Sequence, residues 1–206
     1  MDKKTILFDF DGVILDSFEG AFEVNKKLEP TLTEEWMRRR FEGNINDSYI
    51  DEKGRPATEE EDNEFFNLYI PAMMKFKIFP EMLDVVKKLN ENYRLIIVSS
   101  TITGPIKEYM DGHDATKYFA EIMGNDVHKS KVEKIKMVFN KYGVSAGDCL
   151  FITDTLGDLL EAEKTGVEGI GVTWGFHSAE TLKRGNPVAL VNTPEELVAE
   201  INWYFK

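Results

Sequence analysis

Cysteine, histidine and long apolar runs are scarce in this sequence, and each scarcity excludes some classes of protein or of site. Cys149 is the single cysteine among 206 residues, so no disulfide can form within one chain, which favours a reducing compartment. No apolar run approaches the ~20 residues of a membrane-spanning helix, and the first residues do not resemble a signal peptide. We therefore expect a cytoplasmic protein without a membrane partner, in which Cys149 is a small buried side chain.

Positive charge is also in short supply. The chain has 25 Lys and Arg residues against 37 Asp and Glu residues, which gives a formal net charge of −12. A protein of this charge repels the phosphate backbone of nucleic acids, so we expect no nucleic-acid partner. The three histidines are scattered and the cysteine stands alone, so the sequence has no cluster for zinc. An anionic substrate would need a local positive charge, from a metal ion or from lysines.

One apolar run near the start ends in two aspartates and a glycine. Ile6-Leu7-Phe8 is typical of a short buried parallel strand, and Asp9, Asp11 and Gly12 follow it. Open α/β sheets bind ligands beyond the carboxyl ends of their strands, and residues two apart can face the same side. Two close carboxylates repel each other unless a cation lies between them. The stretch therefore predicts a metal-dependent site with a carboxylate nucleophile or ligand.

The remaining pattern predicts an α/β fold with an insert. Residues 16–78 have helical patterns and no expected strand, whereas strands and helices alternate from Pro80 onwards. This alternation is typical of a doubly wound, Rossmann-like parallel sheet covered by helices on both faces. We predict a catalytic core formed by residues 1–15 and 79–206, with a small α-helical cap at 16–78. The later strands are expected at 93–98, 119–123, 149–153, 169–172 and 188–191.

Polar side chains follow three of these later strands. Ser99 follows one strand, Lys129 and Lys131 come after the next, and Asp154 and Asp158 follow a third. A doubly wound sheet brings such strand ends together, so all of them can meet Asp9 and Asp11 in one crevice.

These residue types suit phosphoryl transfer. Carboxylate oxygens suit Mg²⁺, which commonly joins one or two carboxylates to a substrate phosphate. One carboxylate can attack phosphorus, and a second acid can protonate the leaving oxygen and later deprotonate water. Ser99 and a lysine can hold the phosphoryl oxygens, while Gly12 would let the backbone bend and bring N–H groups to them.

Four stretches, in order and each after an expected strand, resemble the motifs of the haloacid dehalogenase-like hydrolases. They are Asp9-Phe10-Asp11-Gly12-Val13, Ser99, a lysine near Lys131, and Asp154-Thr155-Leu156-Gly157-Asp158. The segment from Gly171 to Phe176 is similar to the one after the fourth motif in phosphoglycolate-phosphatase-like members. The resemblance spans the whole chain and includes a helical cap inserted after the first motif.

The resemblance implies a role for each matching residue. Asp9 would be the nucleophile and Asp11 the general acid/base. Asp9, the backbone carbonyl of Asp11, and Asp154 would hold Mg²⁺, with Asp158 in support. The expected phosphate-binding residues are Gly12, Ser99, Ser100 and Lys131.

The implied activity is that of a Mg²⁺-dependent phosphatase, a phosphoric monoester hydrolase. It would hydrolyse a small phosphorylated metabolite through an aspartyl-phosphate, as a monomer or small homo-oligomer. One alternative is a sugar phosphomutase of the β-phosphoglucomutase type with the same intermediate. Another is a non-catalytic binding or regulatory protein on the same fold.

A few positions depart from the family pattern or carry a structural interpretation. Thr153 stands where relatives usually have glycine, and Lys129 competes with Lys131, which we favour because it is nearer the expected helix start. Structural roles are expected elsewhere: ion pairs with Glu34 and Glu35 on a solvated helix for Arg38–Arg40, packing under a loop for Trp174 and Phe176, and a surface position for His177.

Overall fold

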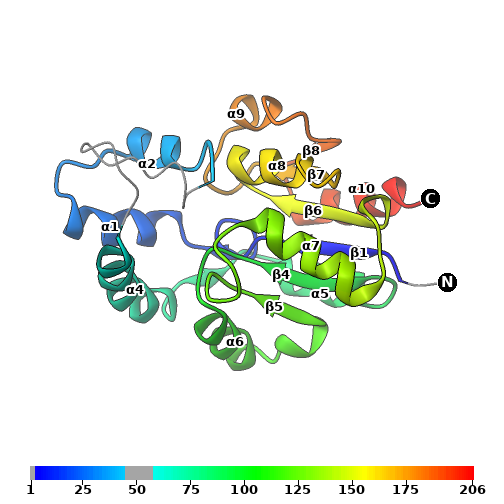
Figure 1. Cartoon of the computed structure of the whole chain (residues 1–206), viewed down its shortest axis with the longest axis horizontal. Coiled ribbons are helices and arrows are strands. Elements are labelled where there is room, and N and C mark those ends of the chain that lie inside the picture. The colour runs from blue at the N-terminus through cyan, green and yellow to red at the C-terminus, as the bar shows by residue number, and fades with distance from the viewer. Residues whose placement is uncertain (1–2, 45–57) are drawn as a thin grey trace.

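The computed structural model describes residues 3–44 and 58–206, which form a six-stranded sheet flanked by helices (Figure 1). The strand order is β5-β4-β1-β6-β7-β8, and every neighbouring pair in it is parallel. This doubly wound order, with the first strand at the centre, confirms the predicted fold class. The strands are β1 (Thr5–Phe8), β4 (Arg94–Val98), β5 (Glu121–Met123), β6 (Cys149–Thr153), β7 (Glu168–Val172) and β8 (Ala189–Val191).

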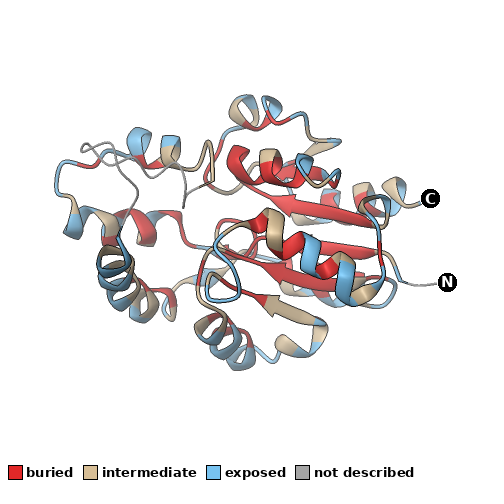
Figure 2. Ribbon diagram, viewed as in Figure 1, coloured by how far each residue is buried: buried red, intermediate tan, exposed pale blue. Residues whose placement is uncertain are grey.

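Helices cover both faces of this sheet, and the alternation along β1 divides the core between them. Ile6 and Phe8 belong to the larger core cluster, whereas Leu7 points into a second cluster on the opposite face. The central strands β1 and β6 are fully buried, the edge strands β5 and β8 are only partly buried, and the helices show buried and exposed sides (Figure 2). The larger cluster includes α5 (Met82–Asn90), α6 (Thr103–Gly112) and α10 (Pro194–Tyr204); the second lies against α7 (Lys131–Tyr142) and α8 (Leu156–Glu163).

The inward side of α7 brings two lysines to the carboxyl edge of the sheet. Its buried residues are Lys131, Lys134, Ile135 and Val138, which lie three, four and seven positions apart along one helical face. Gly143, at φ 64°, ends the helix in the left-handed conformation that glycine adopts without strain. Because α7 follows β5, its first turn lies where the strands end: Lys131 reaches Asp9 after β1, and Lys134 reaches the carbonyl of Ser99 after β4.

The segment between β1 and α5 lies beyond the carboxyl ends of the strands (Figure 1). It contains α1 (Phe18–Leu28), α2 (Glu34–Arg40) and α4 (Glu59–Met73). The expectation of no strand in this part of the chain is wrong at its two ends, because β2 (Leu15–Asp16) pairs antiparallel with β3 (Lys77–Ile78). Strands of two residues are too short to leave an alternating pattern. This pairing joins the points where the chain leaves and re-enters the sheet layer.

The short helix α9 (Ala179–Lys183) before β8 was not among the expected elements. Across residues 3–44 and 58–206, no helix is long and apolar enough to span a bilayer.

The one-sided burial of α7 yields a stability prediction. Ile135 is fully buried in the second core cluster, so Ile135→Ala should lower the free energy of unfolding by about 2–5 kcal/mol. Met137→Ala, two positions along on the exposed side, should change it by no more than about 0.5 kcal/mol. Urea denaturation of both variants measures the difference. Equal effects would contradict the described orientation of α7.

Candidate active site

Asp9 lies at the carboxyl end of β1 and is almost completely buried. Its backbone N–H donates to Ile152 O (2.9 Å), which continues the pairing with β6. The Phe10 N–H donates to Asp9 Oδ1 (2.7 Å), and Lys131 Nζ lies 2.9 Å from Asp9 Oδ2. Burial raises the pKa of Asp9 well above its usual value. The Lys131 charge opposes this rise, and the negative charges of Asp158 and Asp154 add to it.

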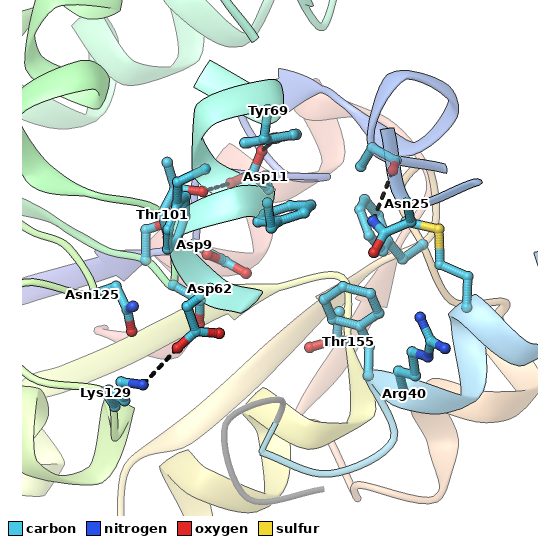
Figure 3. A pocket seen from close by; sticks show the side chains of 18 of the residues that line it. Asp9, Asp11, Asn25, Arg40, Asp62, Tyr69, Thr101, Asn125, Lys129 and Thr155 are labelled. Atoms are coloured by element: carbon cyan, nitrogen blue, oxygen red, sulfur yellow. Dashed lines mark hydrogen bonds and ion pairs between the residues drawn. The ribbon is translucent and has the colours of Figure 1, made fainter. Parts of the chain in front are cut away.

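Lys131 connects two of the predicted acidic residues. Its Nζ donates to Asp158 Oδ2 (2.6 Å) and lies beside Asp9, and the residue is only 2% exposed. Burial lowers the pKa of Lys131, but the charges of Asp158 and Asp9 outweigh burial and leave the pKa above its usual value. Lys129, by contrast, is exposed and pairs with Asp62 of α4 (2.7 Å), as Figure 3 shows. Of the two competing lysines, Lys131 is the one next to Asp9.

Asp154 follows β6 and is fully buried behind the first motif. The Phe176 N–H donates to Asp154 Oδ2 (2.7 Å), while Asp154 Oδ1 is buried without a hydrogen-bond partner among the described residues. Burial raises the pKa of Asp154 to about 7. A methyl group at Gly12 would lie 1.9 Å from Asp154 Oδ2, and one at Gly175 would lie 2.3 Å from it. Both positions therefore need glycine for the backbone to approach this carboxylate.

The first motif turns sharply at Gly12, which has φ 73°, a conformation that glycine adopts readily. The Gly12 N–H donates to Leu15 O (2.9 Å). This hydrogen bond closes the turn with the N–H of Gly12 itself, and the expectation that Gly12 brings backbone N–H groups to a phosphoryl group stays a prediction. Gly12 also leaves the space beside Asp154 that a larger residue would fill.

Asp158 lies in the first turn of α8, where Thr155 caps the helix. The hydroxyl of Thr153 donates to Asp158 Oδ2 (2.8 Å), the same oxygen that Lys131 contacts. Burial raises the pKa of Asp158, but Lys131 and the hydrogen bonds outweigh burial and leave it below its usual value. Thr153, the departure from the family pattern, thus has a definite contact: its hydroxyl holds the second acid of the fourth motif.

Asp11 receives hydrogen bonds from both the core and the inserted segment. The hydroxyl of Tyr69, on α4, donates to Asp11 Oδ1, and Thr101 Oγ1 donates to Asp11 Oδ2 (2.8 Å) (Figure 3). Burial raises the pKa of Asp11, and these two hydroxyls oppose the rise. Burial and the charge of Asp11 raise the pKa of Tyr69 well above its usual value, so the phenol retains its proton.

Ser99 is fully buried at the end of β4, and a lysine holds its backbone. Ser99 Oγ accepts from the Thr101 N–H (3.0 Å), and Lys134 Nζ donates to Ser99 O (2.5 Å). Burial lowers the pKa of Lys134 to about 8. Lys134, Thr101 and Tyr69 were not among the predicted site residues. Helical spacing from Lys131 would have placed Lys134 on the inward face, but no motif marks the other two.

These groups surround a cavity of about 540 Å³ between the sheet edge and the inserted segment. Six of the predicted site residues line it: Asp9, Asp11, Ser99, Ser100, Lys131 and Asp158. Gly12 and Asp154 lie behind this lining and touch each other. The opposite wall comes from α1, α2 and α4, and includes Arg40 and Tyr69.

Two structural interpretations need correction. His177 is buried, not on the surface: its Nδ1 accepts from the Leu156 N–H (2.9 Å), and its Nε2 lies 2.8 Å from Arg38 O. A single polar residue leaves no pattern, but helix ends expose backbone groups that need such partners.

The expected pairs Glu34–Arg38 and Glu35–Arg39 do form. Arg40, however, is only partly exposed, pairs with Glu29 and lines the cavity.

Phe176 and Trp174 pack as expected. The ring of Phe176 lies edge-on to Phe18 (5.0 Å) and to Phe41 (4.9 Å), and the Trp174 indole donates to Val13 O (3.2 Å). Phe18 and Phe41 belong to the inserted segment, so this packing also connects that segment to the core.

The oxygen donors around Asp9 suit Mg²⁺. Within the two described stretches of the chain, no three Asp, Glu, His or Cys side chains converge in metal-ligand geometry. Mg²⁺ needs fewer: it binds through one or two carboxylates together with waters and phosphate oxygens. Asp9 and Asp154 supply two carboxylates, and Asp154 Oδ1 is a buried oxygen without a hydrogen-bond partner among the described residues. The residues present therefore fit this ion.

Comparison with known proteins agrees with this geometry. The family model for haloacid dehalogenase-like hydrolases matches residues 6–172. A protein named probable phosphatase IndB from Dickeya dadantii is 24% identical over 95% of this chain and 92% of its own. A phosphoglycolate phosphatase from Vibrio parahaemolyticus is 24% identical over 96% of this chain and 95% of its own.

A solved structure shares the fold. A hydrolase from Pseudomonas syringae superposes with a TM-score of 0.79 at 19% identity, covering 97% of this chain and 98% of that one. The family match covers most of the chain, from β1 to β7, and includes every predicted motif. The chain therefore belongs to the haloacid dehalogenase-like hydrolase family.

Proposed function

We propose that this protein is a Mg²⁺-dependent phosphatase that hydrolyses a small phosphorylated metabolite through an aspartyl-phosphate on Asp9. The observation that carries the proposal is the buried Asp9 carboxylate, held by Lys131 and placed with Asp11 in the lining of one cavity. Relatives named as phosphatases that cover nearly the whole chain add support.

Two displacements at phosphorus make up the reaction. A carboxylate oxygen of Asp9 attacks phosphorus, the bond to the ester oxygen breaks, and Asp11 gives its proton to that leaving oxygen. Water then attacks the phosphoryl group on Asp9, Asp11 takes a proton from the water, and Asp9 leaves as a carboxylate. Asp11 thus ends the cycle protonated, as it began.

The phosphoryl group needs positive charge and hydrogen-bond donors around its oxygens. Ser99, Ser100 and Lys131 line the cavity beside Asp9 and would serve this purpose. Lys134, behind Ser99, donates to the carbonyl of that residue, and the Thr101 N–H donates to its Oγ, so both groups are held in place.

Mg²⁺ would be held by Asp9, by the backbone carbonyl of Asp11 and by Asp154, with Asp158 supporting the site through Lys131. When bound, the ion supplies positive charge that offsets the phosphoryl oxygens. Phe176 and the glycines at 12 and 175 keep Asp154 in place for this role.

Residues 1–15 and 79–206 would act as the catalytic core and 16–78 as the cap. The cap residues on the opposite wall of the cavity would enclose the substrate and limit the access of water.

A sugar phosphomutase would share every step up to the choice of the group that accepts the phosphoryl group, so that alternative stays a prediction. An assay of β-glucose-1-phosphate isomerisation with a bisphosphate primer separates the two. The cytoplasmic location and the oligomeric state also stay predictions.

The nucleophile assignment predicts the effect of Asp9→Asn. Loss of the attacking carboxylate should lower kcat for an aryl phosphate by about 10⁴-fold or more. The measurement is steady-state hydrolysis, with a thermal unfolding curve to show that the variant is folded. Undiminished turnover in a folded Asp9→Asn protein would contradict the proposal.

The metal assignment predicts the effect of chelation. Treatment with EDTA should remove nearly all phosphatase activity of the wild-type protein, and added Mg²⁺ should restore it, because the cluster around Asp9 then lacks its cation. Full activity of the chelated and dialysed protein would rule the metal out.

The different positions of the two lysines predict different effects of their removal. Lys131→Met should lower kcat by about 10²–10³-fold, because it removes a buried charge beside the transferred phosphoryl group. Lys129→Met serves as the matched control and should change kcat by less than about threefold, since it removes an exposed ion pair. A larger loss from Lys129→Met than from Lys131→Met would reverse the assignment.

A further inference from the structure

A side chain from the inserted segment contacts the general acid/base directly. Tyr69 is 2% exposed, and its hydroxyl donates to Asp11 Oδ1. The other oxygen, Oδ2, accepts from Thr101, which follows β4 in the core. One carboxylate is therefore held between a hydroxyl of the core and a hydroxyl of α4 (Figure 3).

The inserted segment itself fixes the ring of Tyr69. The ring stacks on Phe65 of the same helix, with centroids 5.1 Å apart and planes 14° apart, and it lies 6.0 Å from Phe76. Phe76 packs against α1 at Gly20, where a methyl group would come within 2.0 Å of its ring. The Tyr69 ring is therefore held by packing within the inserted segment, between α4 and α1.

The contact matters because Asp11 must deliver a proton to one particular oxygen. A carboxyl group with a single hydrogen bond can turn about its Cβ–Cγ bond, whereas hydrogen bonds to both oxygens fix its plane. Proton transfer is efficient only within hydrogen-bond reach and in the right direction. If α4 moves away from the sheet edge, Asp11 loses one of its two supports.

We propose that Tyr69 is a positioning residue, which orients the Asp11 carboxyl towards the leaving oxygen while α4 covers the site. It links the closed arrangement of the inserted segment to the proton-transfer step. The inference rests on the proposed phosphatase function, and it assigns to α4 a contact that no motif of the sequence indicates.

The test compares leaving groups in the Tyr69→Phe protein, which loses the hydroxyl and keeps the ring. We measure kcat/KM in Mg²⁺ for a series of phosphomonoesters, from nitrophenyl phosphate to simple alkyl phosphates. This ratio reports the steps up to phosphorylation of Asp9. Nitrophenolate departs without a proton, whereas an alkoxide needs one, so only the alkyl esters depend strongly on Asp11.

The proposal predicts a selective loss. In Tyr69→Phe, kcat/KM should fall by about 10–100-fold for alkyl phosphates and by less than about threefold for nitrophenyl phosphate. Tyr93→Phe is the matched control, because it removes another buried tyrosine hydroxyl, one that donates to Asn202 Oδ1 (2.8 Å) at the end of β4 opposite the site. Its ratio between the two ester classes should equal that of the wild type.

Other outcomes overturn the proposal in distinguishable ways. An equal loss for all esters in Tyr69→Phe would mean that Tyr69 only packs or binds substrate, and no loss would mean that Thr101 alone suffices. In both cases wild-type turnover and its dependence on Asp9 would leave the phosphatase function standing. A wild-type protein that hydrolyses no ester in the series would overturn the proposed function together with this inference.

Discussion

A buried ammonium group among carboxylates is the interaction on which the rest of the site depends. Lys131 Nζ lies 2.9 Å from Asp9 and 2.6 Å from Asp158, and Asp154 is buried in the same cluster. The Lys131 charge lowers the pKa of Asp9 and of Asp158, against the rise that burial and the neighbouring carboxylates cause. Several contacts hold Lys131 in this position. The inward face of α7 begins at Lys131, and the Glu161 carboxylate accepts the Lys131 N–H at the start of that helix (3.0 Å).

The fold and the acidic cluster could be predicted because both depend on patterns that are visible along the sequence. Apolar runs ending in polar residues marked the strands, and the doubly wound order then placed Asp9, Ser99 and Asp158 at one edge. Tyr69 could not be predicted, since its aromatic stripe on α4 is typical of any packed helix and only tertiary structure brings its hydroxyl to Asp11. The burial of His177 could not be predicted for a similar reason. Its partners are backbone groups of α8 and of α2, and no sequence pattern indicates them.

The inserted segment contributes more to the site than a cover. Several contacts connect it to the core, among them the Tyr69 hydroxyl on Asp11, the Phe18 and Phe41 rings on Phe176, and the hydrogen bond from the Gly157 N–H to Phe41 O (2.9 Å). The last two meet the loop and helix that hold Asp154 and Asp158. Movement of the segment would therefore reach both Asp11 and the acidic cluster. The β2–β3 pairing joins the two strands that connect the segment to the core.

The most direct test of the central claim is to find where the phosphoryl group resides during turnover. The enzyme is mixed with an aryl phosphate and Mg²⁺, quenched rapidly in acid, reduced with borohydride and mapped by peptide mass spectrometry. We predict that Asp9 alone is modified, that the modification requires substrate, and that Asp9→Asn protein shows none. A wild-type enzyme that releases phosphate at full rate while Asp9 stays unmodified, or one modified at another residue, would contradict the account.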